Sequence, residues 1–176
     1  MTRTALLALF LAASSVPALA QHHHAPAASP YAGFERREVK ALSDQQVADL
    51  KAGRGMGYAL AAELNGYPGP SHVLELGEQL GLTEAQRRRM QDLFDAMKAE
   101  TIPLGERLLV QEAELERQFS GRTATAAILT AATAEIGATQ GALRAAHLRY
   151  HLSTVEILTP EQVCKYAETR GYVANR

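Results

Sequence analysis

The residues best placed to carry chemistry are two histidines four positions apart, His147 and His151, in the sequence HLRYH. On an α-helix this spacing puts both imidazoles on one face, close enough to bind a single metal ion. Position 148 is Leu, so the glutamate that acts as general base in HExxH zinc proteases is absent and hydrolysis is not indicated. The alternative is that both histidines are core or groove residues without a ligand.

Two further potential ligands lie upstream, where His72 and Glu75 share a face of the helix that we expect after Pro70. In a helical hairpin, the segment before the first long helix lies beside the end of the second one. This arrangement would bring His72 and Glu75 close to His147 and His151. Three imidazoles and one carboxylate suit Zn²⁺, Ni²⁺, Co²⁺ or Cu²⁺, so the sequence predicts a divalent transition-metal site and no organic cofactor.

A second possible metal site is formed by His22, His23 and His24. If a signal peptide is cleaved after Ala20, Gln21 becomes the amino terminus and His23 the third residue. Its imidazole, the terminal amine and two backbone amides can then form the square-planar site that Cu²⁺ and Ni²⁺ favour. Cyclisation of Gln21 would remove the amine, and a solvated His-rich tail with weak metal affinity is the alternative.

Residues 1–20 have the features of a secretory signal peptide, with Arg3 near the start, an apolar stretch over 5–16 and an A-x-A cleavage site that ends at Ala20. No second apolar stretch follows. We therefore expect an exported, periplasmic protein whose mature chain does not insert into the membrane. The formal net charge of −1 gives no bulk attraction to nucleic acid.

The sequence contains one cysteine, Cys164. It cannot form an internal disulfide, so three states remain open: a small buried apolar side chain, a free thiol or an intermolecular disulfide. No Ser or Cys nucleophile has a nearby His, and Gly53-x-Gly55-x-Gly57 lacks the strand that precedes a phosphate-binding loop. We expect a binding protein without catalytic residues, and an uncharacterised enzyme is the remaining alternative.

The elements that must position these residues are helices. Residues 21–41 show little apolar periodicity and predict a disordered tail containing His and Pro, and residues 42–69 predict an extension of short helices. In residues 70–172 Gly and Pro are scarce and apolar residues recur at three- and four-residue steps, which predicts helix throughout. Residues 173–176 form a C-terminal tail.

Within residues 70–172 we expect four helices. The first begins at Ser71 and ends at Gly81, the second extends from Thr83 to about Phe119, the third begins near Thr123 or Thr125, and the last begins after Thr159 and ends at Gly171. Pro103 lies inside the second helix and must bend it. The fold class is therefore all-α, a long kinked hairpin with short flanking helices. Its long apolar stripes favour a homodimer, because a hairpin has little interior of its own.

The second and the last of these helices begin with the related sequences LTEAQ and LTPEQ. In each, the Thr at the N-cap can accept a hydrogen bond from the N–H three residues on, where a Gln reaches back to the Thr N–H, which forms a capping box. The residues of the two motifs are Leu82, Thr83, Gln86, Leu158, Thr159 and Gln162. LSDQQ at 42–46 follows the same pattern.

Two Leu-Thr-x-x-Gln motifs around a long hairpin, in an exported chain of this size, resemble the Spy/CpxP family of periplasmic stress proteins, over residues 70–172. The resemblance implies a cradle-like antiparallel homodimer that senses or buffers a transition metal, acts as an ATP-independent chaperone, or does both. Its implied partners are unfolded clients or a signalling protein in the membrane. A pure chaperone or adaptor without a metal role is the alternative.

Metal-sensing members of that family are similar in taking ligands from their first helix and from a His-x-x-x-His/Met pair upstream of the last motif. His147 and His151 match the pair, and His72 matches the first helix. Leu76 stands four residues after His72, where the family has a second ligand. Glu75 is the carboxylate that could take its place.

Client binding requires a surface that combines apolar and charged side chains. Arg87, Met90, Phe94 and Met97 on the second helix could form one. The alternative is structural, because Met and Phe at helical spacing usually belong to the core and successive arginines to a solvated face.

Overall fold

The computed structural model describes residues 29–172. The expected signal peptide, the histidines at 22–24, the first part of the expected tail and residues 173–176 lie outside the described part. Within this part, residues 33–172 belong to one compact unit.

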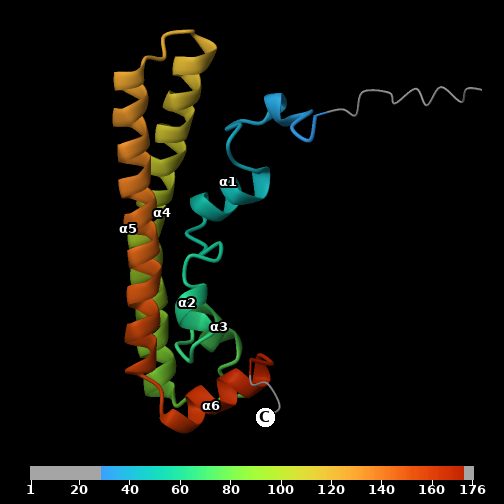
Figure 1. Ribbon diagram of the computed structural model, residues 1–176. Helices are drawn as coiled ribbons and strands as arrows, with labels where there is room; N and C mark the ends of the chain where they lie inside the picture. Colours follow the sequence, from blue (N-terminus) through green and yellow to red (C-terminus); the bar gives the residue numbers. More distant parts are fainter. Residues whose placement is uncertain (1–28, 173–176) are drawn as a thin grey trace, which may run out of the picture. The chain divides into compact units, whose positions relative to one another are not determined.

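All regular elements of the described residues are helical, which confirms the predicted all-α class (Figure 1). They are the 3₁₀ helix η1 (Phe34–Arg36) and the α-helices α1 (Asp44–Lys51), α2 (Leu60–Glu63), α3 (Pro70–Glu75), α4 (Glu84–Ser120), α5 (Ala126–Val155) and α6 (Pro160–Thr169).

The two long helices α4 and α5 form an antiparallel hairpin, as the sequence predicts (Figure 1). Pro103 lies inside α4, where it cannot donate a backbone hydrogen bond. Helices α1, α2 and α3 pack along the hairpin, and α6 lies at the end opposite the α4–α5 turn. The short helices at 42–69 are thus packed on the hairpin rather than set apart from it.

Both bonds of the capping box are present at Ser43, Thr83 and Thr159, so these predicted helix starts are confirmed. The prediction for Ser71 is wrong. Helix α3 begins after Gly69 with Pro70 at its first position, has no side-chain cap and ends at Glu75 rather than at Gly81. Proline suits this position because its fixed φ is helical and its missing N–H would have no helical partner.

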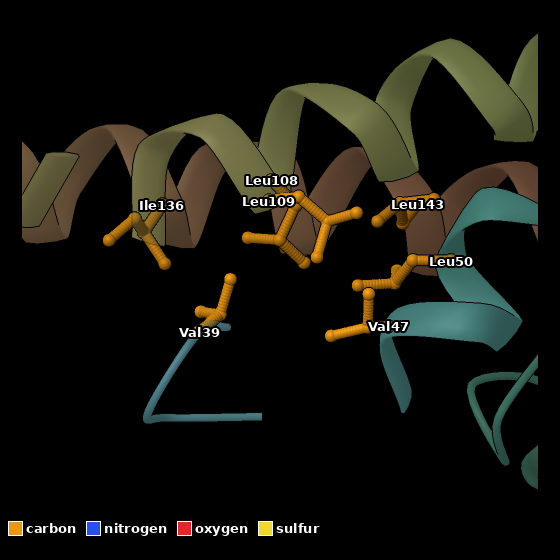
Figure 2. Packing of buried hydrophobic residues seen from close by; sticks show 7 residues of the cluster. All are labelled: Val39, Val47, Leu50, Leu108, Leu109, Ile136 and Leu143. Atoms are coloured by element: carbon orange, nitrogen blue, oxygen red, sulfur yellow. The ribbon is translucent and has the colours of Figure 1, made fainter. Parts of the chain in front are cut away.

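One apolar core joins α1 to the middle of the hairpin. It consists of Val39, Val47, Leu50, Leu108, Leu109, Ile136 and Leu143 (Figure 2). Helices α1 and α4 approach closely here, since a Cβ added to Gly105 would lie 2.5 Å from the backbone oxygen of Leu50. Glycine at 105 is therefore required by the contact between the two backbones.

A second apolar core holds α6 in place. Val73 of α3, Met90 of α4 and Tyr166 of α6 are buried together with Leu80. This core fixes the helix that begins with LTPEQ against the first turns of the helix that begins with LTEAQ.

The burial of three side chains decides between the alternatives that the sequence left open. Cys164 is exposed, so the buried alternative is wrong and a free thiol or an intermolecular disulfide remains. Met90 and Met97 are buried, which agrees with a core role and removes them from any exposed client surface.

Each described helix is too short or too polar to span a membrane.

We predict that Gly105→Ala lowers the free energy of unfolding by about 1–3 kcal/mol, because the new methyl group cannot fit against the Leu50 carbonyl. Chemical denaturation monitored by circular dichroism would measure it. The matched control is Gly137→Ala in α5, where a Cβ meets no atom within 4 Å. That control should be neutral or slightly stabilising, since Ala favours helix over Gly. Equal effects at both positions would contradict the close approach of α1 and α4.

Candidate metal site

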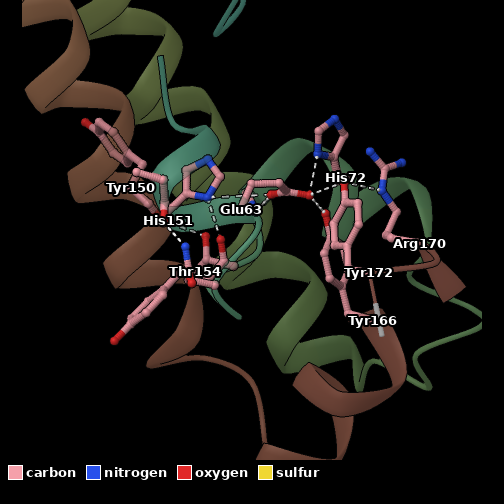
Figure 3. A network of polar contacts seen from close by, with 12 residues as sticks. Glu63, His72, Tyr150, His151, Thr154, Tyr166, Arg170 and Tyr172 are labelled. Carbon is pink, nitrogen blue, oxygen red and sulfur yellow. Dashed lines mark hydrogen bonds and ion pairs between the residues drawn. The ribbon is translucent and has the colours of Figure 1, made fainter. Parts of the chain in front are cut away.

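A buried carboxylate, Glu63, lies where α2, α3, α5 and α6 meet (Figure 3). Glu63 is the last residue of α2 and is 6 % exposed. Its Oε1 accepts hydrogen bonds from the hydroxyl groups of Tyr166 and, at 3.1 Å, Tyr172. Its Oε2 accepts one from the backbone N–H of Gly69 at 3.1 Å. A carboxylate out of water needs such partners, because an unpaired buried charge is very costly.

Two of the predicted ligands contact this carboxylate from opposite sides. The Nδ1 atom of His72, on α3, lies 3.5 Å from Oε1 of Glu63. The Nδ1 atom of His151, on α5, lies 3.7 Å from Oε2. The predicted approach of the helix that carries His72, α3, to the end of α5 is therefore confirmed. Glu63 lies between the two imidazoles.

The tautomer of His151 is set by the backbone. Its Nδ1 atom is 2.6 Å from the carbonyl oxygen of Tyr67, which can only accept, so in the neutral ring Nδ1 carries the proton and the lone pair is on Nε2. A metal-binding histidine is usually oriented by such a second bond. The same ring explains Gly69, since a Cβ there would come within 2.9 Å of Nε2.

His147 lies one helical turn before His151 and is 3 % exposed. Its ring stacks on Tyr58, with the centroids 6.2 Å apart, and its Nε2 atom has no hydrogen-bond partner. Burial lowers the pKa of the His147 imidazole, and the neighbouring His151 lowers it further. The ring therefore stays neutral at neutral pH, as a metal ligand must.

The four predicted ligands, His72, Glu75, His147 and His151, line one cavity of about 590 Å³ together with Glu63. Glu75 is exposed, and its carboxylate accepts a hydrogen bond from the Ser71 hydroxyl at 3.4 Å. Within residues 29–172, no three His, Cys, Asp or Glu side chains are close enough together to hold an ion. The predicted ligands thus share a cavity without forming an assembled set.

The charge state of Glu63 follows from its partners. Burial alone would raise the pKa of this carboxyl, but contact with His72 and the hydrogen bonds from the two tyrosine hydroxyls outweigh it and lower the pKa from 4.5 to about 2. Burial and the bond to Glu63 raise the pKa of the Tyr166 hydroxyl, which therefore remains a donor. Glu63 is therefore a charged acceptor in the folded chain at neutral pH.

Glu63, Tyr166 and Tyr172 were not among the residues that the sequence predicted. A signal for Glu63 was present, since it is the one charged residue in the apolar stretch YALAAEL at 58–64. A lone charge on such a stretch indicates either an exposed face or a buried group with partners. The tyrosines carried no comparable signal.

The two LTxxQ motifs contact each other. The side-chain amide of Gln86 donates to Oε1 of Gln162 at 2.8 Å, and the amide of Gln162 donates back at 3.1 Å. The Gln86 amide also donates to the backbone oxygen of Ile157 at 2.9 Å. Each glutamine thus closes its own capping box and also joins α4 to α6, which places Tyr166 within reach of Glu63.

The donor atoms fit a transition metal in kind. Imidazole nitrogens with a fixed tautomer, a neutral buried imidazole without a partner and an ionised carboxylate are ligands that Zn²⁺, Ni²⁺, Co²⁺ and Cu²⁺ accept. Their present arrangement satisfies Glu63 with protein donors instead. Binding of an ion would require the carboxylate to exchange partners.

Comparison with known proteins gives one family match. Residues 57–164 match the model of a family described as heavy-metal resistance. No curated protein and no solved structure gives a significant match. The matched range begins before α2, so it includes Glu63 as well as both histidines of α5.

We predict that the free energy of unfolding falls as the pH is lowered from about 4.5 to about 2. In this range the unfolded chain protonates its glutamate at position 63 whereas the folded chain keeps it ionised. The stabilisation is complete above pH 4.5 and amounts to about 3 kcal/mol. Urea denaturation at several pH values would measure the dependence. Glu63→Gln should flatten it, and Glu75→Gln, at an exposed position, controls for the loss of one charge.

Proposed function

Because the chain belongs to the heavy-metal resistance family, we propose that it binds a divalent transition-metal ion in the cavity beside Glu63. His72, His151 and Glu63 are the proposed ligands, with His147 next to them. One observation carries the proposal: two histidines predicted as ligands, from segments far apart in the sequence, lie on either side of one buried carboxylate.

The family match and the chemistry of the residues support this proposal independently. The family is part of the Spy/CpxP-like superfamily. The buried Nε2 atom of His147 has no hydrogen-bond partner, which a bound metal ion would supply. Glu63 replaces Glu75 as the proposed carboxylate ligand, because Glu63 contacts both imidazoles and Glu75 contacts Ser71.

We predict that calorimetric titration of the chain without residues 1–20 shows one site for at least one of Zn²⁺, Ni²⁺, Co²⁺ and Cu²⁺. The double variant His147→Ala/His151→Ala should lose this site, and Glu63→Gln should weaken it roughly tenfold or more. Unchanged binding in the double variant would contradict a site in the hairpin.

Two controls separate the competing ligand sets. Deletion of residues 21–24 removes the histidines of the possible second site and should leave the hairpin site unchanged. Glu75→Gln compares the carboxylate chosen from sequence with the one chosen from structure. An effect of Glu75→Gln equal to that of Glu63→Gln would argue against Glu63 as the specific ligand.

The proposed setting is the periplasm, where the chain would serve in the response of the cell envelope to metal stress. The signal-peptide features of residues 1–20 support export. A role in sensing would add a signalling protein in the membrane as partner, whereas a role in buffering would need only the metal.

We further propose that the chain is a homodimer and that it holds unfolded clients without ATP. The end of the hairpin near the α4–α5 turn supports both proposals, because it exposes apolar side chains. Val110 is 65 % and Phe119 57 % exposed on α4, and Ile128 and Leu129 are exposed at the start of α5. Such groups favour contact with a second copy or with a client.

We predict that light scattering after size-exclusion chromatography gives the mass of a dimer for the wild type and of a monomer for Phe119→Ser/Ile128→Ser. The same variant should protect an aggregating client less well, in chelator as well as in metal. Leu152→Ser is the control, since Leu152 is exposed at the other end of α5. A wild-type monomer would contradict the dimer, and undiminished client protection by the variant would contradict a client surface at the turn.

A further inference from the structure

The Glu63 carboxylate already accepts three hydrogen bonds, and two of them are at Oε1. Oε1 takes the hydroxyl groups of Tyr166 and Tyr172 and faces His72. Oε2 takes the N–H of Gly69 and faces His151. Each carboxylate oxygen offers about two lone-pair sites, so an incoming metal ion finds none open at Oε1.

The partners of Glu63 differ in how readily they can give way. The two histidines are proposed ligands and would contact the same ion. Gly69, the N-cap residue of α3, is buried between two buried prolines, Pro68 and Pro70, whose rings restrict the backbone. The two tyrosines remain: Tyr166 belongs to α6 and Tyr172 follows it. They bind Oε1, the oxygen that faces His72.

A positive charge accompanies the tyrosines. Arg170, the C-cap residue of α6, donates from Nε to the Tyr172 hydroxyl at 3.4 Å. Its guanidinium lies 6.0 Å from the centre of the Tyr166 ring. Arg170 thus supplies positive charge next to Glu63, where a metal cation would be repelled by it.

We propose that docking of α6 on Glu63 opposes metal binding. We call the contact of Tyr166 and Tyr172 with Glu63 the lock. In the metal-free chain, Tyr166 and Tyr172 occupy Glu63 and thereby hold the end of α6 against α2 and α3. Binding of the ion and docking of α6 compete for the same carboxylate oxygen, so each weakens the other. This inference rests on the proposed metal site and adds its regulation.

We expect metal binding to release the C-terminal end of α6 and to leave its start in place. The start of α6 is joined to α4 by the pair Gln86 and Gln162, and neither residue contacts Glu63. Metal binding therefore leaves this pair in place and loosens the residues from Tyr166 to Tyr172. The LTPEQ motif acts as the hinge, and the C-terminal part of α6 as the moving part.

If the tyrosine hydroxyls instead supported metal binding, their removal would change the metal affinity in the opposite direction. Hydrogen bonds to a ligating carboxylate often orient it and strengthen metal binding. If the tyrosines acted in this way, removing a hydroxyl would lower the metal affinity. If they form a lock, removing one raises it.

The experiment titrates wild type, Tyr166→Phe and Tyr150→Phe with Zn²⁺ and Co²⁺ by calorimetry, and follows Co²⁺ absorption. Tyr150 is the matched control, since it lies beside His151 on α5 and its hydroxyl interacts with Glu100 rather than Glu63. We expect Tyr166→Phe to bind the metal roughly tenfold more tightly, the effect of one lost hydrogen bond to a charged group. Tyr150→Phe should bind like the wild type.

A second measurement uses the wild type alone, so it does not depend on the folding of a variant. Hydrogen exchange of the backbone amides is compared with and without Zn²⁺. The amides of residues 166–172 should exchange faster with the metal, whereas those of α4 near Gln86 should not change.

The outcomes separate this inference from the proposed function. Metal binding with unchanged or lower affinity in Tyr166→Phe, or with unchanged or slower exchange at 166–172, would overturn the lock and leave the metal site standing. Absence of metal binding in the wild type and in Tyr166→Phe would overturn both.

Discussion

The described structure around the site depends on the need to satisfy one buried negative charge. Glu63 is ionised and almost inaccessible, so it must be surrounded by donors. Those donors come from the N-cap of α3 and from the end of α6, and an imidazole of α3 and one of α5 face the carboxylate. This carboxylate therefore links α2, α3, α5 and α6, and it adds to the apolar core that already holds α6 against α3 and α4.

The capping motifs serve the same arrangement from a distance. Each LTxxQ glutamine completes its own helix start, and the pair Gln86 and Gln162 joins the two starts. Helix α6 is consequently held at two points, at its beginning by an amide pair and near its end by Tyr166 on Glu63. The glutamines that cap their own helices therefore also form a tertiary contact.

The metal chemistry proposed for the chain is one of competition rather than of an open, preformed site. The donors have the right types and a common cavity, and burial lowers the pKa of the His147 imidazole. The carboxylate is satisfied by phenolic hydroxyl groups and is accompanied by the positive charge of Arg170. A chain built in this way can convert occupancy of the cavity into a change in α6, which is what a protein that responds to metal needs.

The sequence by itself determined the long helices, the three helix starts with a capping box and the histidine pair. These depend on contacts within a few residues: the 3.6-residue period, a cap that spans three positions and an i, i+4 spacing. It did not determine which carboxylate meets the histidines, since Glu63 and Glu75 are both within reach along the chain and only packing buries one and exposes the other. The exposure of Cys164 and the burial of Met90 were decided in the same way. Tertiary structure alone brings Tyr166 to Glu63 across 103 positions, a contact for which no local pattern exists.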